Sequence, residues 1–153
     1  MFIKAIKAAL FAAFLIFTSL PAMAQQMAGT VERLKGDASR TLDGSTAGLA
    51  VGGTVFVGDR VKTGPDARLL VRFADGSSLT LGEKAEVAID DLVFTPTAKG
   101  PEIGHQALVM VVGVFRYTSG AIGKTSPSQV TFGTPTATIG IRGTDFLGGE
   151  LTV

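Results

Sequence analysis

A strict alternation of apolar and polar residues on either side of Asp75-Gly76 constrains this chain more than any other feature. Residues 68–73 carry an apolar side chain at every odd position, and residues 79–81 resume the pattern. A period of two residues is typical of a half-buried β-strand, and Asp-Gly favours a two-residue hairpin turn with positive φ at both positions. The passage therefore predicts two antiparallel strands, with Gly76 at positive φ.

The remainder of the chain shows the same strand-and-turn pattern in short segments. Further strands are predicted over residues 29–34, 87–89, 130–132 and 139–141, with Gly- and Pro-containing turns between them. Many short strands joined by close turns predict an all-β domain. Residues 71–73 and 130–132 open two similar passages, so we expect stacked, repeated β units of the β-helix or solenoid kind rather than a sandwich.

Residues 108–115 differ from the other segments because they are apolar on both faces. Such a run predicts a strand that is covered on both sides or lies at the middle of the fold, and a buried helix is the alternative. Its many valines and the interrupting Gly113 favour the strand. Loops are expected over residues 95–101 and 119–128.

Residues 1–24 have the pattern of an export signal. Lys4 and Lys7 precede an apolar run from residue 8 to residue 20, and Ala22-Met23-Ala24 matches a cleavage site. A retained membrane anchor is the alternative, but the run is shorter than the ~18–20 residues that a spanning helix requires. We therefore expect cleavage after Ala24, no stable membrane span, and a single mature domain over residues 25–153 in the periplasm or outside the cell.

The mature chain is close to neutral and contains no cysteine. The signal holds two of the 14 basic residues, which leaves 12 against 13 acidic residues. There is no basic run and few aromatic residues, so the composition argues against nucleic-acid binding. Without disulfides, an exported domain of this size has to be stabilised by its own core.

Two blocks of sequence carry a family resemblance. The first comprises residues 58–64 (GDRVKTG), 71–77 (VRFADGS) and 79–81 (LTL), and the second comprises residues 134–137 (TPTA) and 142–146 (RGTDF). In these blocks, and in their order, the chain resembles the FecR domain family, named for the periplasmic iron-dicitrate transport regulator. The resemblance covers roughly residues 29–146.

The resemblance implies a periplasmic, β-helix-like domain that binds other proteins and relays or supports envelope signalling. It implies no catalysis and no cofactor, and it describes this chain as a free-standing exported member. The family motif maps onto Gly58, Asp59, Thr63, Gly64, Asp75, Gly76, Thr134, Pro135, Arg142, Gly143 and Thr144. The main role expected of Asp59 and Asp75 is to stabilise the turns in which they lie.

Arg142 has two interpretations. Its guanidinium group can donate five hydrogen bonds in a fixed fork, so it can tie neighbouring carbonyl groups or Asp145 together. Alternatively, it can anchor a partner or an anionic ligand. The first interpretation is favoured because arginines of limited exposure are usually paired within their own fold.

Other chemical groups give weaker signals. His105 is the single histidine, and without cysteine it cannot complete a zinc site, so we expect a solvated loop residue. Asp90-Asp91 lacks a calcium-loop pattern, and Gly140 with Gly143 precedes no helix that could bind phosphate. A hydrolase using Glu83 and Glu86 is an alternative that nothing in their spacing singles out.

A small-ligand or glycan-binding module is a second alternative. Such a site would need a concave surface lined by aromatic rings. Tyr117 is the only tyrosine and the chain has no tryptophan. We therefore favour a protein-interaction module, whose partner is another envelope protein or a second copy of the chain.

The C-terminus predicts an open sheet edge. Residues 146–147 and 151–153 suggest strand segments around a Gly148-Gly149 turn, with little charge to protect them. We expect this edge to accept a strand from a partner or a second copy, and a frayed tail is the alternative. The candidate interaction residues are Arg142, Asp145, Leu151 and Val153.

Overall fold

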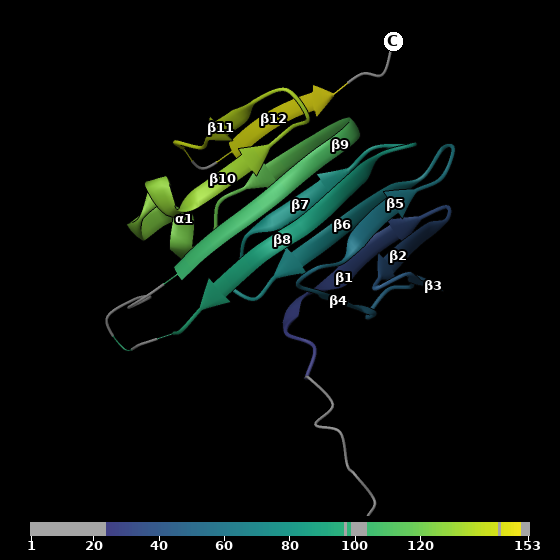
Figure 1. Cartoon of the computed structure of the whole chain (residues 1–153), viewed down its shortest axis with the longest axis horizontal. Helices are drawn as coiled ribbons and strands as arrows, with labels where there is room; N and C mark the ends of the chain where they lie inside the picture. The colour runs from purple at the N-terminus through teal and green to yellow at the C-terminus, as the bar shows by residue number, and fades with distance from the viewer. Residues whose placement is uncertain (1–23, 97, 99–103, 144, 151–153) are drawn as a thin grey trace, which may run out of the picture.

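The computed structural model describes residues 24–96, 98, 104–143 and 145–150, and shows one curled β-sheet with a single short helix (Figure 1). The prediction of an all-β domain is confirmed. The elements in chain order are β1 (Met27–Lys35), β2 (Ala38–Leu42), β3 (Ser45–Gly48), β4 (Thr54–Phe56), β5 (Arg60–Thr63), β6 (Arg68–Phe73), β7 (Ser78–Leu81), β8 (Glu86–Phe94), β9 (Gly104–Thr118), α1 (Ala121–Thr125), a 3-10 turn (Pro127–Gln129), β10 (Val130–Gly133), β11 (Thr138–Gly140) and β12 (Asp145–Glu150).

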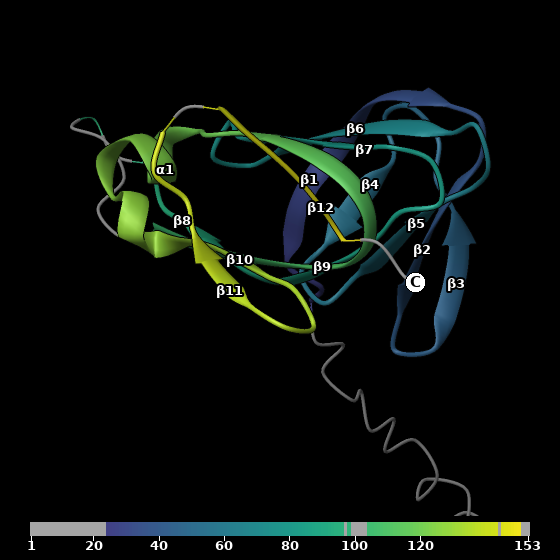
Figure 2. The ribbon, with the colours of Figure 1, turned by 90° about the horizontal axis from the view of Figure 1, so that it is seen from above.

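The long strand β9 organises the sheet. The strand order is β3-β2-β5-β8-β9-β7-β6-β1-β4, so β9 separates two groups of four strands. Its first half also pairs with β10, and its second half also pairs with β12. Seen from above, the sheet folds over into two layers, and β9 passes through the curve from one layer to the other (Figure 2).

Gly113 is the point at which β9 changes direction. Before it, the buried side chains are at even positions, Leu108 and Met110, whereas after it they are at odd positions, Phe115 and Tyr117. Gly113 has a φ of +100°, which is outside the range that residues with a side chain readily adopt. This local irregularity keeps one face of the strand toward the interior in both layers.

The change of parity accounts for only part of the apolar run over residues 108–115, because Val109 and Val111 precede Gly113 and are half-buried on the face opposite Leu108 and Met110. The predicted strand and its central position are confirmed. Coverage on both sides is not found, because Val114 is 49% exposed. The interior-facing positions simply shift by one residue within the run.

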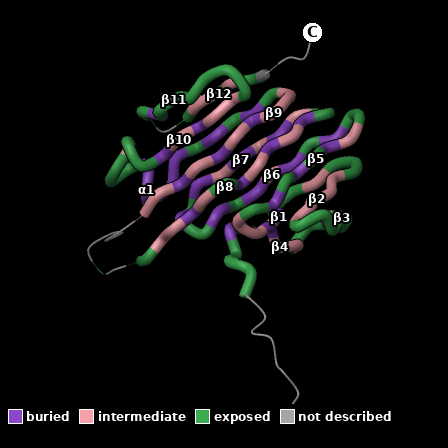
Figure 3. Tube along the Cα trace, in the orientation of Figure 1, coloured by how far each residue is buried: buried purple, intermediate pink, exposed green. Residues whose placement is uncertain are grey.

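The two layers enclose one hydrophobic core, in which buried and exposed positions alternate along the strands (Figure 3). Phe132 from β10 stacks on Phe115 from β9 with ring centroids 4.8 Å apart. Tyr117 meets Phe132 edge-on at 5.0 Å, and Phe146 from β12 lies 5.7 Å from Phe115. This aromatic cluster packs Phe146 of the second sequence block against β9 and β10 in the core.

The β6–β7 hairpin is confirmed, but its loop has three residues rather than two. The amide of Phe73 donates to the carbonyl of Ser77, and the amide of Gly76 donates to the carbonyl of Phe73. Gly76 has a φ of +82°, as predicted, whereas Asp75 does not have a positive φ. A turn followed by one residue with a left-handed backbone conformation closes this hairpin. The prediction of a two-residue loop was therefore wrong.

The predicted solenoid of stacked units is not confirmed. Every described strand pair is antiparallel except β9 with β10, and the sheet is continuous across the curve. Residues 119–128, expected to be a loop, contain α1 and part of the 3-10 turn. Gly148-Gly149 is not a turn, since both residues pair with β9 within β12. Residues 1–23 and part of the expected 95–101 loop lie outside the described residues.

We predict that Gly113→Ala destabilises the fold by roughly 2–4 kcal/mol, because it adds backbone strain and overpacking. An added Cβ would lie 2.5 Å from the Cβ of Ala85, and the positive φ would remain. Gly140→Ala is the matched control, because nothing lies within 4 Å of an added Cβ there. Equal chemical-denaturation midpoints for the two variants would contradict the role given to Gly113.

Candidate functional site

The first motif block builds the β4–β5 turn. Asp59 is fully buried, and its carboxylate accepts hydrogen bonds from the Phe56 amide at 2.8 Å and from Arg40 at 3.1 Å. The Arg40 guanidinium group also lies over the Phe56 ring. Asp59 therefore fixes the turn, as predicted, and its charge is compensated by Arg40.

Thr63 and Gly64 link this block to the β7–β8 turn. The Thr63 hydroxyl donates to the Gly82 carbonyl at 2.7 Å and accepts from the Ala85 amide at 2.9 Å. The Gly64 carbonyl accepts from the amide of Lys84 at 3.1 Å. The motif residues between positions 58 and 64 therefore hold neighbouring turns together through hydrogen bonds.

Asp75 belongs to a buried polar cluster. Its Oδ1 accepts from the Ser77 amide at 3.0 Å and the Ser77 hydroxyl at 2.5 Å. Gln106 accepts from the Tyr117 hydroxyl at 2.7 Å and from Ser77 at 3.3 Å. Burial raises the pKa of Tyr117 well above its usual range, although the hydrogen bond with Ser77 opposes this effect and the charge of Asp75 adds to it.

The backbone at Gly120 packs closely against this polar cluster. A Cβ at Gly120 would lie 2.3 Å from the Ser77 nitrogen and 2.5 Å from the Asp75 carbonyl oxygen. The Asp75 carbonyl also accepts from the Ala121 amide at the start of α1. The β6–β7 turn and the start of α1 are therefore locked together, and the cluster is closed to solvent.

The second motif block forms a separate turn. The Thr134 hydroxyl accepts from the Ala137 amide at 3.0 Å, and Pro135 lies exposed in the same turn between β10 and β11. The Gly143 carbonyl accepts from the Ser119 hydroxyl at 2.7 Å. Thr144, Leu151 and Val153 lie outside the described residues, so their predicted roles stay predictions.

The predicted pairing of Arg142 with Asp145 is wrong. Asp145 instead accepts a bidentate pair of hydrogen bonds from Arg116. The register of β12 on β9 places Asp145 opposite Thr118 and beside Arg116 on the outer face of the sheet. Arg142 is exposed and makes no hydrogen bond or ion pair with a described residue.

His105 is a strand residue rather than a loop residue. It pairs with Val93 near the start of β9, and its Nε2 lies 2.6 Å from Oδ2 of Asp91. Within the part of the chain that the structure describes, no group of three acidic, histidine or cysteine side chains could hold a metal ion. The contact of His105 with Asp91 was not anticipated, because the register between β8 and β9 is not visible in the sequence.

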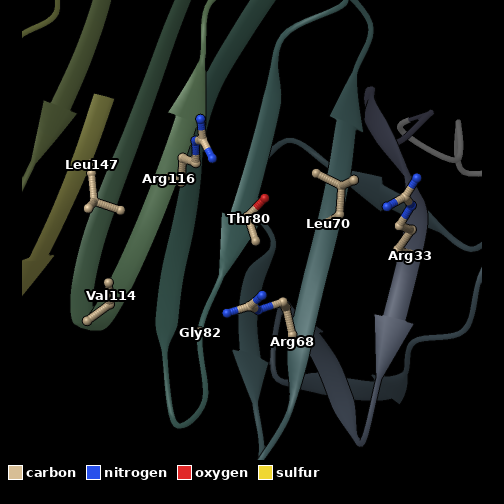
Figure 4. A pocket seen from close by; sticks show the side chains of 8 residues that line it. All are labelled: Arg33, Arg68, Leu70, Thr80, Gly82, Val114, Arg116 and Leu147. Atoms are coloured by element: carbon tan, nitrogen blue, oxygen red, sulfur yellow. The ribbon is translucent and has the colours of Figure 1, made fainter. Parts of the chain in front are cut away.

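The most distinctive surface is a groove on the outer face of β1, β6, β7, β9 and β12 (Figure 4). We define the arginine groove as a cavity of about 450 Å³. Its described lining residues are Arg33, Arg68, Leu70, Thr80, Gly82, Val114, Arg116 and Leu147.

Strand register places these residues in rows across the sheet. Arg33 lies opposite Leu70, Leu70 opposite Thr80, Thr80 opposite Arg116, and Arg116 opposite Leu147. The outward positions of five strands therefore meet on one face. Sequence reasoning missed this groove because its arginines are up to 83 positions apart in the chain and form no basic run.

Ion pairs determine the electrostatics around the groove. The hydrogen bonds from Arg116 hold the pKa of Asp145 below its usual value. On the neighbouring strands β6 and β1, Nε of Arg72 donates a hydrogen bond to Oε2 of Glu32 at 2.8 Å. This hydrogen bond lowers the pKa of the Glu32 carboxyl group. Arg33 and Arg68 form no ion pair with a described residue, so their guanidinium groups are available to a ligand. The charge of Arg33 also contributes to the lowered pKa of Glu32.

Fold and geometry together define a small all-β protein whose motif residues tie turns together. A profile of the FecR protein family matches residues 59–152, which is more than half of the chain and includes both sequence blocks. The chain belongs to the FecR family, as its motifs predicted.

Two further comparisons add little to this assignment. No curated protein matches the chain. A solved structure described as a "Cell surface anchoring domain" is similar at 24% identity and a TM-score of 0.39, over 40% of this chain and 82% of that chain. In the described residues, no helix has the length and apolar character needed to cross a membrane.

We predict that the ion pairs of Glu86 make stability depend on pH. Burial raises the pKa of Glu86, but hydrogen bonds from Arg60 at 2.8 Å and from Lys62 outweigh it, and the pKa lies below its usual value. Because the unfolded state takes up the proton first, this stabilisation is complete above the unfolded pKa of about 4.3 and is lost as the pH falls.

Melting temperatures between about pH 7 and pH 3 test this prediction. Glu86→Gln should melt below the wild type at neutral pH and should lose less on acidification. Asp90→Asn is the control, since Asp90 is exposed and forms no ion pair with a described residue. Parallel pH profiles for wild type and Glu86→Gln would show that the ion pairs contribute nothing.

Proposed function

We propose that this FecR-family protein is a non-enzymatic interaction module of the bacterial cell envelope, which supports or relays signalling in the periplasm. Membership of a signalling and regulatory family supports the assignment. The residues of the family motif hold turns and pack the core, rather than converging on a reactive centre. Extracellular release is the alternative location.

The observation that carries the proposed mode of binding is the exposed side of β12. Asp145–Glu150 pairs with β9 along one side, and no described strand pairs with its other side. Leu147 is 71% exposed on this strand. An unpaired strand edge presents backbone donors and acceptors to an incoming strand.

We therefore infer that β12 accepts a strand from another envelope protein or from a second copy of this chain. A side chain such as Leu147 would contact alternate residues of the added strand. The pairing of residues 145–150 with β9 argues against a frayed tail over this segment. Leu151 and Val153, the other residues predicted to take part in this edge, lie outside the described residues.

A small-ligand or glycan-binding module is the second candidate, and the volume of the arginine groove favours it. However, none of the eight described residues that line the groove is aromatic. Sugar recognition would then lack the stacking surface that it commonly uses. The interaction module remains the better supported proposal.

We predict that the exported protein begins at Gln25. The basic residues Lys4 and Lys7, the apolar run and Ala22-Met23-Ala24 support cleavage after Ala24. N-terminal sequencing and the intact mass of protein from the periplasmic fraction check this result. Recovery of chains that still carry Met1 in the membrane fraction would favour a retained anchor instead.

We predict that Leu147→Lys weakens association through the β12 edge by about tenfold or more, because charge on an edge strand opposes strand addition. A point substitution is a more specific test than deletion of residues 148–153. The deletion would also remove Gly148 and Gly149, which pair with β9. Light scattering of the mature protein over a range of concentrations measures self-association, and co-purification measures capture of a partner.

Val51→Lys is the matched control. Val51 is 64% exposed and lies in a turn rather than on a strand edge. It should leave association unchanged, and both variants should melt like the wild type. If the wild type neither self-associates nor captures a partner, or if both variants associate equally well, β12 is not the docking edge.

A further inference from the structure

The arginine groove concentrates positive charge on a protein that carries little net charge. Three of its described lining residues are arginines, and none is acidic. The mature chain as a whole has 12 basic and 13 acidic residues. The groove is therefore a local charge asymmetry produced by strand register, and charge complementarity calls for an anionic occupant.

The individual arginines are not equivalent. The guanidinium group of Arg116 is engaged by Asp145 through Nε and Nη2. Arg33 on β1 and Arg68 on β6 have no such partner among the described residues. Arg68 extends toward Gly82, where the neighbouring strand offers no side chain to fill the space (Figure 4).

Aliphatic side chains line the groove beyond Arg33 and Arg68. Leu70 on β6 is half-buried, whereas Val114 on β9 is 49% and Leu147 on β12 is 71% exposed. Arginine forks match the planar carboxylate group, and the aliphatic side chains offer contacts to apolar residues that follow the carboxylates. A free small anion would leave this aliphatic floor unused.

Spacing across the sheet limits the occupant further. Arg33 on β1 and Arg68 on β6 lie on neighbouring strands with an offset of two residues, because Arg33 pairs with Leu70 and Lys35 pairs with Arg68. One strand interval of roughly 4.8 Å and two residues of roughly 3.4 Å each place their backbones about 8 Å apart. Side chains two residues apart in an extended peptide are separated by roughly 7 Å and point to the same side, so they can reach both arginines.

One end of the groove is less positive than the other. The adjoining hollow is lined by Lys35, Asp66, Arg68 and Glu83, so acidic side chains lie close to Arg68 on that side. Glu83 is held there because it accepts a hydrogen bond from the Asp66 amide at 2.8 Å. The carboxylates of a ligand would therefore bind best between Arg33 and Arg68, on the side away from Asp66 and Glu83.

We propose that the arginine groove binds an extended acidic peptide segment of a partner protein, with carboxylates at Arg33 and Arg68 and apolar residues on the Leu70–Val114–Leu147 floor. This surface is on the face of the sheet, whereas the edge of β12 offers backbone groups, and Leu147 is the one described lining residue that the two proposals share. It adds recognition of side-chain charge to the backbone pairing proposed above. It does not require that pairing.

The test uses the mature protein and a fluorescein-labelled octapeptide that carries two glutamates two residues apart, followed by leucine and valine at the next two positions on the same side. Fluorescence anisotropy should show saturable binding that weakens as salt is added. The same peptide with glutamines should bind at least tenfold more weakly. Arg33→Gln combined with Arg68→Gln should cause a loss of the same size.

Lys124→Gln is the matched control, because it removes one exposed positive charge on α1, away from the groove. It should bind the peptide like the wild type. Melting curves establish that the arginine variants are folded, and light scattering establishes whether association through β12 is unchanged. Failure of the groove is thereby separated from failure of the β12 edge.

Three outcomes would overturn the proposal. The first is equal binding of the glutamate and glutamine peptides. The second is equal binding of the peptide by wild type and the folded double arginine variant. The third is tighter binding of a sulfated oligosaccharide with the same dependence on Arg33 and Arg68, which would assign the groove to a polyanionic glycan.

Discussion

The bend of β9 at Gly113 is the constraint on which the rest of the structure depends. Without β9, the strand order divides into β3-β2-β5-β8 and β7-β6-β1-β4, and no strand pairing joins these groups. The left-handed φ of Gly113 and its close approach to Ala85 allow one strand to serve both layers. The enclosed core, the arginine groove and the β12 edge all follow from this single continuous strand.

Buried polar groups then fix the turns that the strands require. Asp59 with Arg40, Thr63 with the Gly82 carbonyl, and Asp75 with Ser77 each satisfy backbone or side-chain donors away from water. An unpaired buried group would cost about 1–3 kcal/mol, so these residues have few substitutes. The family motif is therefore a description of turn geometry, which explains why it names no reactive site.

Local patterns in the sequence were sufficient for most of the strands, although not for β2 and β3, and for one key glycine. Alternation over residues 68–73 predicted β6 correctly, and Asp75-Gly76 predicted the positive φ of Gly76. The loop length was wrong because hydrogen bonding between Phe73 and Ser77 includes Ala74 in the turn. The alternation determines which side of a strand is buried, but it does not determine which strands are neighbours.

For that reason, the candidate site could not be predicted from the sequence. Arg116 lay just beyond the strand predicted over residues 108–115 and was not expected to hold Asp145, since only the register of β12 on β9 brings the two together. The arginine groove needs the order of five strands, which depends on contacts far apart in the chain. Similarly, the solenoid expectation followed from repeated local patterns, whereas β9 imposes one continuous antiparallel sheet.

The position of β9 in the chain also sets the order in which the molecule can assemble. Eight strands precede it, and the two groups to which they belong are interleaved in sequence, with β1, β4, β6 and β7 in one and β2, β3, β5 and β8 in the other. A chain emerging from its N-terminus cannot connect these groups by strand pairing until residues 104–118 have followed. Pairing over such long separations is slow, so the two groups stay unconnected until β9 has formed between them. Closure of the sheet is therefore a late step in folding.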